Sequence, residues 1–68
     1  MSAVTLMMKT GALFYTKDYN TVEEVDRAIR RDESITVFWY TSWGKRYQET
    51  LRVDREDVSH FLTEREIP

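Results

Sequence analysis

Few residues in this sequence have the types and spacing that could bind a metal ion. The single histidine, His60, stands three residues after Asp57 and four residues before Glu64. On a helix this spacing would bring three potential ligands of a divalent metal ion to one side. Zinc sites usually add further histidines or cysteines, and the chain has one histidine and no cysteine. We therefore interpret these three residues as a solvated polar face and predict no metal site.

The residues that covalent catalysis would need are missing as well. A serine nucleophile requires a base beside it and a third group that orients the base. Nothing near Ser42 or Ser59 in the sequence supplies such a set. With two glycines in the whole chain, there is also no glycine-rich phosphate-binding loop. We expect no enzymatic activity and no cofactor.

The stretch from Ser34 to Val53 stands out because it combines large aromatic rings with arginines. Residues 35–41 are almost all β-branched or aromatic, and residues 47–53 resume this pattern after Gly44. These residue types fit a pleated, half-buried surface, and a glycine between two such runs predicts a β-hairpin.

The turn of this hairpin decides which side chains share a face. In a three-residue loop, Ser42 and Trp43 form a type I turn and Gly44 adopts the left-handed conformation of a G1 bulge. This register, which the turn chemistry favours, pairs Trp39 with Tyr47. The alternative, a two-residue turn that starts at Gly44, slips the pairing by one residue and exchanges the partners.

In the favoured register, one face of the hairpin is apolar, and the other carries aromatic rings among polar and positively charged side chains. Tyr, Trp, Phe and Arg are enriched at the centres of protein interfaces, so the mixed face and the loop are a candidate binding surface. The candidate contact residues are Phe38, Tyr40, Trp43, Arg46, Gln48 and Arg52. The same side chains could instead bind single-stranded nucleic acid, or pack against the rest of the domain.

The segment before this hairpin predicts a second hairpin and a helix. Residues 4–9 alternate in polarity, and residues 12–16 form another strand-like run, so the two are expected to pair around Gly11. One long strand kinked at Gly11 is the alternative. Thr21 and Glu24 then form the pattern of a capping box, which predicts a helix from about Val22 to Asp32.

The segment after the main hairpin predicts a second helix. Asp54 is expected to cap it, and Val53 before the cap with Val58 after it fits a hydrophobic staple. Val58, Phe61 and Leu62 have the spacing of an inward-facing helical stripe.

These elements predict an α+β fold in which an antiparallel sheet has two helices packed on one face. The order of elements is ββαββα, or βαββα if the first hairpin is one long strand. We expect a four-stranded sheet whose other face stays open. Residues 1–68 should form one small domain with frayed ends at about residues 1–3 and 64–68.

The composition narrows the classes of function. The chain has 68 residues and a formal net charge of −2, with its charges interspersed. It therefore offers no strong field to nucleic acid or to an acidic membrane surface. No apolar run approaches the ~18 residues that would span a bilayer, and no signal-peptide pattern is present, so we expect a cytoplasmic protein.

The small size of the domain is a reason for it to associate with a partner. A domain this short buries only about 60% of the surface of its unfolded chain, and without cysteine it has no disulfide to compensate. We therefore expect a non-enzymatic binding module whose partner is another protein, with homodimer formation as one form of this. The alternative is binding of single-stranded nucleic acid, against which the acidic balance argues.

Overall fold

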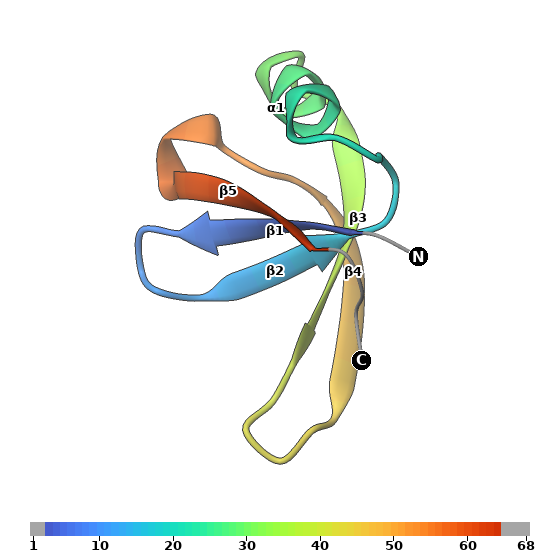
Figure 1. Ribbon diagram of the computed structural model, residues 1–68, viewed down its shortest axis with the longest axis vertical. Helices are drawn as coiled ribbons and strands as arrows, with labels where there is room; N and C mark the ends of the chain where they lie inside the picture. The colour runs from blue at the N-terminus through green and yellow to red at the C-terminus, as the bar shows by residue number, and fades with distance from the viewer. Residues whose placement is uncertain (1–2, 65–68) are drawn as a thin grey trace.

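Five antiparallel strands and one helix make up the fold (Figure 1). The computed structural model describes residues 3–64 of the chain. The elements are β1 (Ala3–Met8), β2 (Leu13–Thr16), α1 (Val22–Arg30), β3 (Ser34–Tyr40), β4 (Arg46–Arg52), the 3-10 turn η1 (Arg55–Asp57) and β5 (Val58–Glu64). The strands form one sheet in the order β4-β3-β2-β1-β5. The α+β class is therefore confirmed, with five strands in place of the expected four.

The sheet is strongly twisted, and its two hairpins extend in different directions. In Figure 1, β1, β2 and β5 fan out to one side, whereas the β3–β4 hairpin runs across them. The helix α1 lies at the top of this view, and the tip of the β3–β4 hairpin lies at the bottom, away from the helix. The far half of this hairpin therefore extends beyond the part of the sheet that α1 covers.

The first two strands form the predicted hairpin rather than one kinked strand. Leu6 pairs with Phe14, and the N–H of Gly11 donates to the carbonyl of Met8 at 2.9 Å. Gly11 has a φ of 92°, a left-handed conformation that glycine adopts without steric cost.

The helix α1 begins at the predicted capping box. The hydroxyl of Thr21 accepts a hydrogen bond from the Glu24 N–H at 3.2 Å and donates to the Glu24 carboxylate at 3.1 Å. The helix ends in a Schellman motif, in which the N–H of Asp32 donates to Ile29 and that of Glu33 donates to Ala28. Both ends of a nine-residue helix are thus satisfied by local hydrogen bonds.

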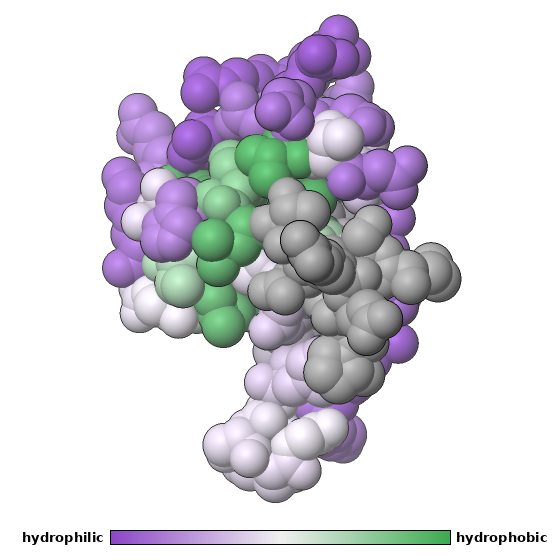
Figure 2. All heavy atoms as spheres, in the orientation of Figure 1, coloured by the Kyte–Doolittle hydropathy of each residue, from purple (hydrophilic) through white to green (hydrophobic). Residues whose placement is uncertain are grey.

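The core lies between α1 and one face of the sheet. Its buried side chains come from β1, α1, β3, β5 and the segment that follows β4, so no element forms it alone. They include Val4, Leu6, Val25, Ala28, Ile29, Ile35, Val37, Val53 and Val58. Figure 2 shows hydrophobic residues gathered over the middle of the molecule, with hydrophilic residues around the helix end.

The predicted second helix is wrong: residues 58–64 form strand β5, which pairs with β1. Leu6 pairs with Phe61 and Met8 pairs with Val58, while the register shifts between Met7 and Met8. This β-bulge leaves Ser59 unpaired, so Val58 and Phe61 lie on the same face although they are three positions apart in the sequence. The bulge therefore produces a spacing that resembles the repeat of a helix.

The predicted capping residue for that helix caps η1 instead. The carboxylate of Asp54 accepts from the N–H of Glu56 at 3.0 Å. Val53 and Val58, on either side of this turn, are both buried as the staple pattern predicts. Ala3 and Glu64, which the sequence places in frayed ends, pair with each other. The remainder of those ends lies outside the described residues.

Strands β2 and β3 pair at one position, Tyr15 with Phe38. Hydrogen bonds from side chains extend the contact between the two strands. The buried Thr16 hydroxyl donates to the carbonyl of Thr36 at 2.9 Å. The carboxylate of Asp18 accepts from the Thr36 N–H at 2.8 Å. Both backbone groups of Thr36 are therefore satisfied where β2 ends.

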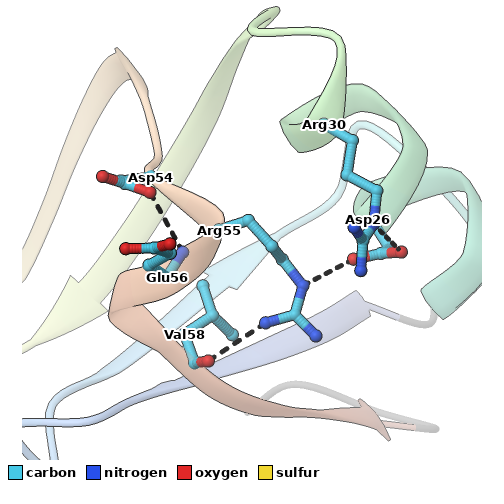
Figure 3. A network of polar contacts seen from close by, with 6 residues as sticks. All are labelled: Asp26, Arg30, Asp54, Arg55, Glu56 and Val58. Carbon is cyan, nitrogen blue, oxygen red and sulfur yellow. Dashed lines mark hydrogen bonds and ion pairs between the residues drawn. The ribbon is translucent and has the colours of Figure 1, made fainter.

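A polar network connects α1 to η1 (Figure 3). Asp26 of α1 accepts from Arg30 at 2.8 Å and from Arg55 at 2.7 Å. Arg55 also donates to the carbonyl of Val58 at 3.1 Å, at the start of β5. The hydrogen bond from Arg30, with that from Arg55, holds the pKa of Asp26 below its ordinary value despite opposing desolvation.

Candidate protein-binding surface on the β3–β4 hairpin

The hairpin has the register that its turn chemistry predicts. Trp39 pairs with Tyr47, and their rings stack with centroids 6.0 Å apart. The N–H of Gly44 donates to the carbonyl of Thr41 at 2.9 Å, and Gly44 has a φ of 85°. A three-residue loop with Gly44 in the left-handed conformation therefore forms the tip.

The tip presents the most exposed large apolar side chain among the described residues. Trp43 is 78% exposed, and Tyr40 and Tyr47 at the base of the loop are about half as exposed, at 39% and 40%. The hairpin arm is mostly pale in Figure 2, the colour of residues of intermediate hydropathy such as Trp and Tyr. A Trp with Tyr neighbours on a projecting arm is the composition of an interface anchor.

Phe38 lies beneath the candidate surface and not on it, because it is only 2% exposed. The Arg46 guanidinium covers its ring at 4.4 Å, and the Lys17 ammonium lies 5.3 Å from the ring centroid. The Tyr15 ring stacks against Phe38 at 5.5 Å. Phe38 therefore supports the side chains above it, and Arg46 provides the outer surface at this point.

The other candidate residues occupy the exposed face of β4. Gln48 accepts a hydrogen bond from Arg46 at 3.2 Å, so the two side chains hold each other along the strand. Arg52 lies at the far end of the strand, where its guanidinium is 3.5 Å from the carboxylate of Asp32. Tyr40, Arg46 and Gln48 are thus close to the tip, whereas Arg52 belongs to the end of the hairpin that α1 contacts.

The structure adds exposed residues on the opposite face of the hairpin. Tyr47, on the helix-facing side, is 40% exposed, and Lys45 lies 5.2 Å above its ring. Next to them a groove of about 460 Å³ runs between Leu13, Phe14 and Trp39. The lengths of the elements could have predicted this exposure. An 11-residue helix is about 16 Å long, whereas two seven-residue strands with a loop reach well beyond it, so the helix cannot cover the whole hairpin.

The residues around His60 lie in a turn and a strand, not on the helix over which their spacing was considered. Asp57 ends η1 and His60 lies within β5, so the helical spacing that would align them is absent. His60 Nδ1 instead lies 3.2 Å from the Ser59 hydroxyl. Among the described side chains, which do not include that of Glu64, no three His, Asp or Glu groups gather closely enough to hold a metal ion.

Comparison of the chain with protein-family models, with curated proteins and with solved structures found no significant match. Over the described part of the chain, no helix is long and apolar enough to cross a membrane.

Proposed function

We propose that this protein is a non-enzymatic binding module that docks onto a protein partner through the β3–β4 hairpin. The observation that carries the proposal is the exposure of Trp43, at 78%, on the tip of an arm that extends away from α1. Leaving such a ring in water is unfavourable by about 25 cal/mol per Å² of apolar surface, and a partner pocket would recover this free energy.

Contacts within the hairpin also hold the base of the arm, and such preorganisation lowers the entropy lost on association. Stacking between Trp39 and Tyr47 holds the base of the arm, and Lys45 lies over the outer member of this pair. Arg46 is fixed over Phe38 on the opposite face. An aromatic anchor between two cations fits an apolar pocket with an acidic rim.

The alternative function, binding of single-stranded nucleic acid, has weaker support. Base stacking needs an open ring face, and the ring of Phe38 is covered by Arg46 and Tyr15. The net charge of −2 also opposes binding to a polyanion. Tight, steeply salt-dependent binding of a short oligonucleotide would replace the protein-binding proposal.

The proposal is tested by affinity capture from native lysate, with the wild type and Trp43→Ala compared by quantitative mass spectrometry. Leu62→Ala is the matched control, because Leu62 is a 43% exposed apolar residue on β5, away from the hairpin tip. We expect Trp43→Ala to lose proteins that the wild type and the control retain, with unchanged melting temperatures. Equal recovery by all three proteins would contradict the proposal.

A further inference from the structure

The strand β4 leaves one of its two hydrogen-bonding edges free. The N–H of Thr41 donates to the carbonyl of Lys45 at 2.9 Å, which makes these two residues a hydrogen-bonded pair. Such pairs alternate along an antiparallel ladder, so the backbone groups of residues 47, 49 and 51 face β3. Those of residues 46, 48, 50 and 52 face away from the sheet, and within the described residues they have no hydrogen-bond partner.

This edge is open to a partner along its whole length. Every residue of β4 is exposed except Leu51, which is partly buried. The strand contains no proline, and its pairing with β3 runs through seven residues without a bulge. Proline and bulges are two of the devices that block an edge, and without them the backbone of β4 can pair with one more strand, provided that the partner accommodates its charged side chains.

We infer that the added strand is β4 of a second copy, paired antiparallel about a two-fold axis at Gln48. The inference rests on the proposed function, because the hairpin is the docking arm in both, and it names the partner. A two-fold axis repeats each contact symmetrically and occupies the free edge of β4 in both copies. No edge of β4 is then left for a third copy, so the assembly is a dimer.

Charge complementarity favours this register over the next one. An axis at Glu49 would place Glu49 opposite itself and Arg46 opposite Arg52, so that three pairs of like charges face each other. The axis at Gln48 places Arg46 opposite Thr50 and Lys45 diagonal to Glu49. Opposite charges then become diagonal neighbours at two symmetric positions, while Arg46 and Arg52 move from directly opposite each other to diagonal positions, where like charges are farther apart.

The length of the strand favours the same register. With the axis at Gln48, Gly44 of one copy lies opposite Arg52 of the other, so the loop begins where the partner strand ends. An axis at Thr50 would carry the loop of each copy four residues further along its partner. Trp43 would then lie opposite Asp57, against the turn η1 and beyond the edge that can pair.

The favoured register also gives Trp43 a place to bind. It brings the loop that carries Trp43 of one copy beside Val53 of the other, where a shallow groove of about 610 Å³ lies between α1 and the end of β4. Val53 lies in this groove among three arginines, Arg30, Arg52 and Arg55, and two carboxylates, Asp32 and Asp54, which supply the acidic part of its rim. Guanidinium groups bind the faces of indole rings favourably, so the groove fits the exposed anchor of the second copy.

Disulfide cross-linking tests the inference in a chain that has no cysteine of its own. Gln48→Cys, Glu49→Cys and Thr50→Cys are oxidised separately, and the fraction of covalent dimer is followed with time. Only the residue on the two-fold axis meets its own copy, at a Cα separation of about 5.5 Å, within the range of a disulfide. We expect Gln48→Cys to form dimer at least tenfold faster than the other two variants.

Sedimentation equilibrium of the wild type, Trp43→Ala and Leu62→Ala provides the second measurement. We expect the wild type and Leu62→Ala to dimerise, and Trp43→Ala to do so at least tenfold more weakly. A wild type that stays monomeric, or faster cross-linking at position 49 or 50, would overturn the inference. Trp43-dependent capture of another protein by a monomeric wild type would leave the proposed function standing.

Discussion

The Nε of Arg55 lies 2.7 Å from a carboxylate oxygen of Asp26, and this contact joins the turn before β5 to the helix α1. Both side chains are about one-third exposed, at 34% for Arg55 and 28% for Asp26. The guanidinium also lies 5.0 Å from the ring centroid of Phe61. One arginine therefore fixes the last strand to both the helix and the core.

Arg55→Ala should destabilise the fold by about 1.5–3 kcal/mol, the range for hydrogen bonds to a charged group. Arg30→Ala is the matched control, since it removes the other partner of Asp26 from a side chain that is 62% exposed. An exposed i,i+4 pair contributes only about 0.3–0.5 kcal/mol. Urea denaturation of both variants measures the difference, and equal losses would show that Arg55 does not bridge α1 to β5.

The stability of the protein should fall in acid through Asp26. Because the pKa of Asp26 is lowered in the folded state, its stabilising effect is complete above the ordinary pKa and is lost as the pH falls through the folded-state pKa. Asp26→Asn has no such group to titrate. We expect the difference in unfolding free energy between the two proteins to be constant near pH 7 and to shrink below about pH 4. A difference independent of pH would contradict this.

Gly44→Ala should cost about 1–2 kcal/mol through backbone strain alone. A Cβ at this position would meet no atom within 4 Å, but the φ of 85° is unfavourable for any residue with a side chain. Gly44→Asn should cost less, because asparagine tolerates the left-handed region better. Thermal unfolding gives the two free energies. A larger loss of stability in Gly44→Asn than in Gly44→Ala would mean that backbone strain at residue 44 does not cause the destabilisation.

Asp32→Gly should stabilise the protein by about 0.5 kcal/mol. Asp32 has a φ of 61° at the position after the helix cap where glycine is preferred, so glycine relieves steric strain. The substitution also removes the ion pair with Arg52, which is too exposed to offset this gain fully. Asp32→Ala loses the ion pair without relieving strain and should destabilise. Chemical denaturation should therefore find Asp32→Gly the most stable of the three proteins, the wild type intermediate and Asp32→Ala the least stable.

Local signals in the sequence were sufficient for the first helix and for the main hairpin. The hydroxyl of Thr21 and the carboxylate of Glu24 define the start of α1 within four residues of chain. Gly44 alone sets the turn type, and the turn type sets the pairing of Trp39 with Tyr47. In both cases the deciding interaction lies between neighbours in the sequence.

The errors arose where the deciding partner is distant in the sequence. Residues 58–64 form a strand because β1 offers them an edge more than 50 residues earlier, and the bulge at Ser59 hides the alternation of a strand. Phe38 is buried because Tyr15 and Lys17 reach it from β2 and the segment after it. Neither contact leaves a mark in the local pattern, so the sequence pattern placed Phe38 on the exposed face of the hairpin although it is buried.

The position of β1 between β2 and β5 affects how the chain can fold during its synthesis. Leu6 emerges from the ribosome early, yet its neighbour Phe61 emerges more than 50 residues later. Until then the edge of β1 is open, and Val58 is missing from the core. The sheet can therefore close only after the β5 segment has left the exit tunnel, and a nascent chain that stalls before Val58 would expose an unpaired apolar strand to chaperones.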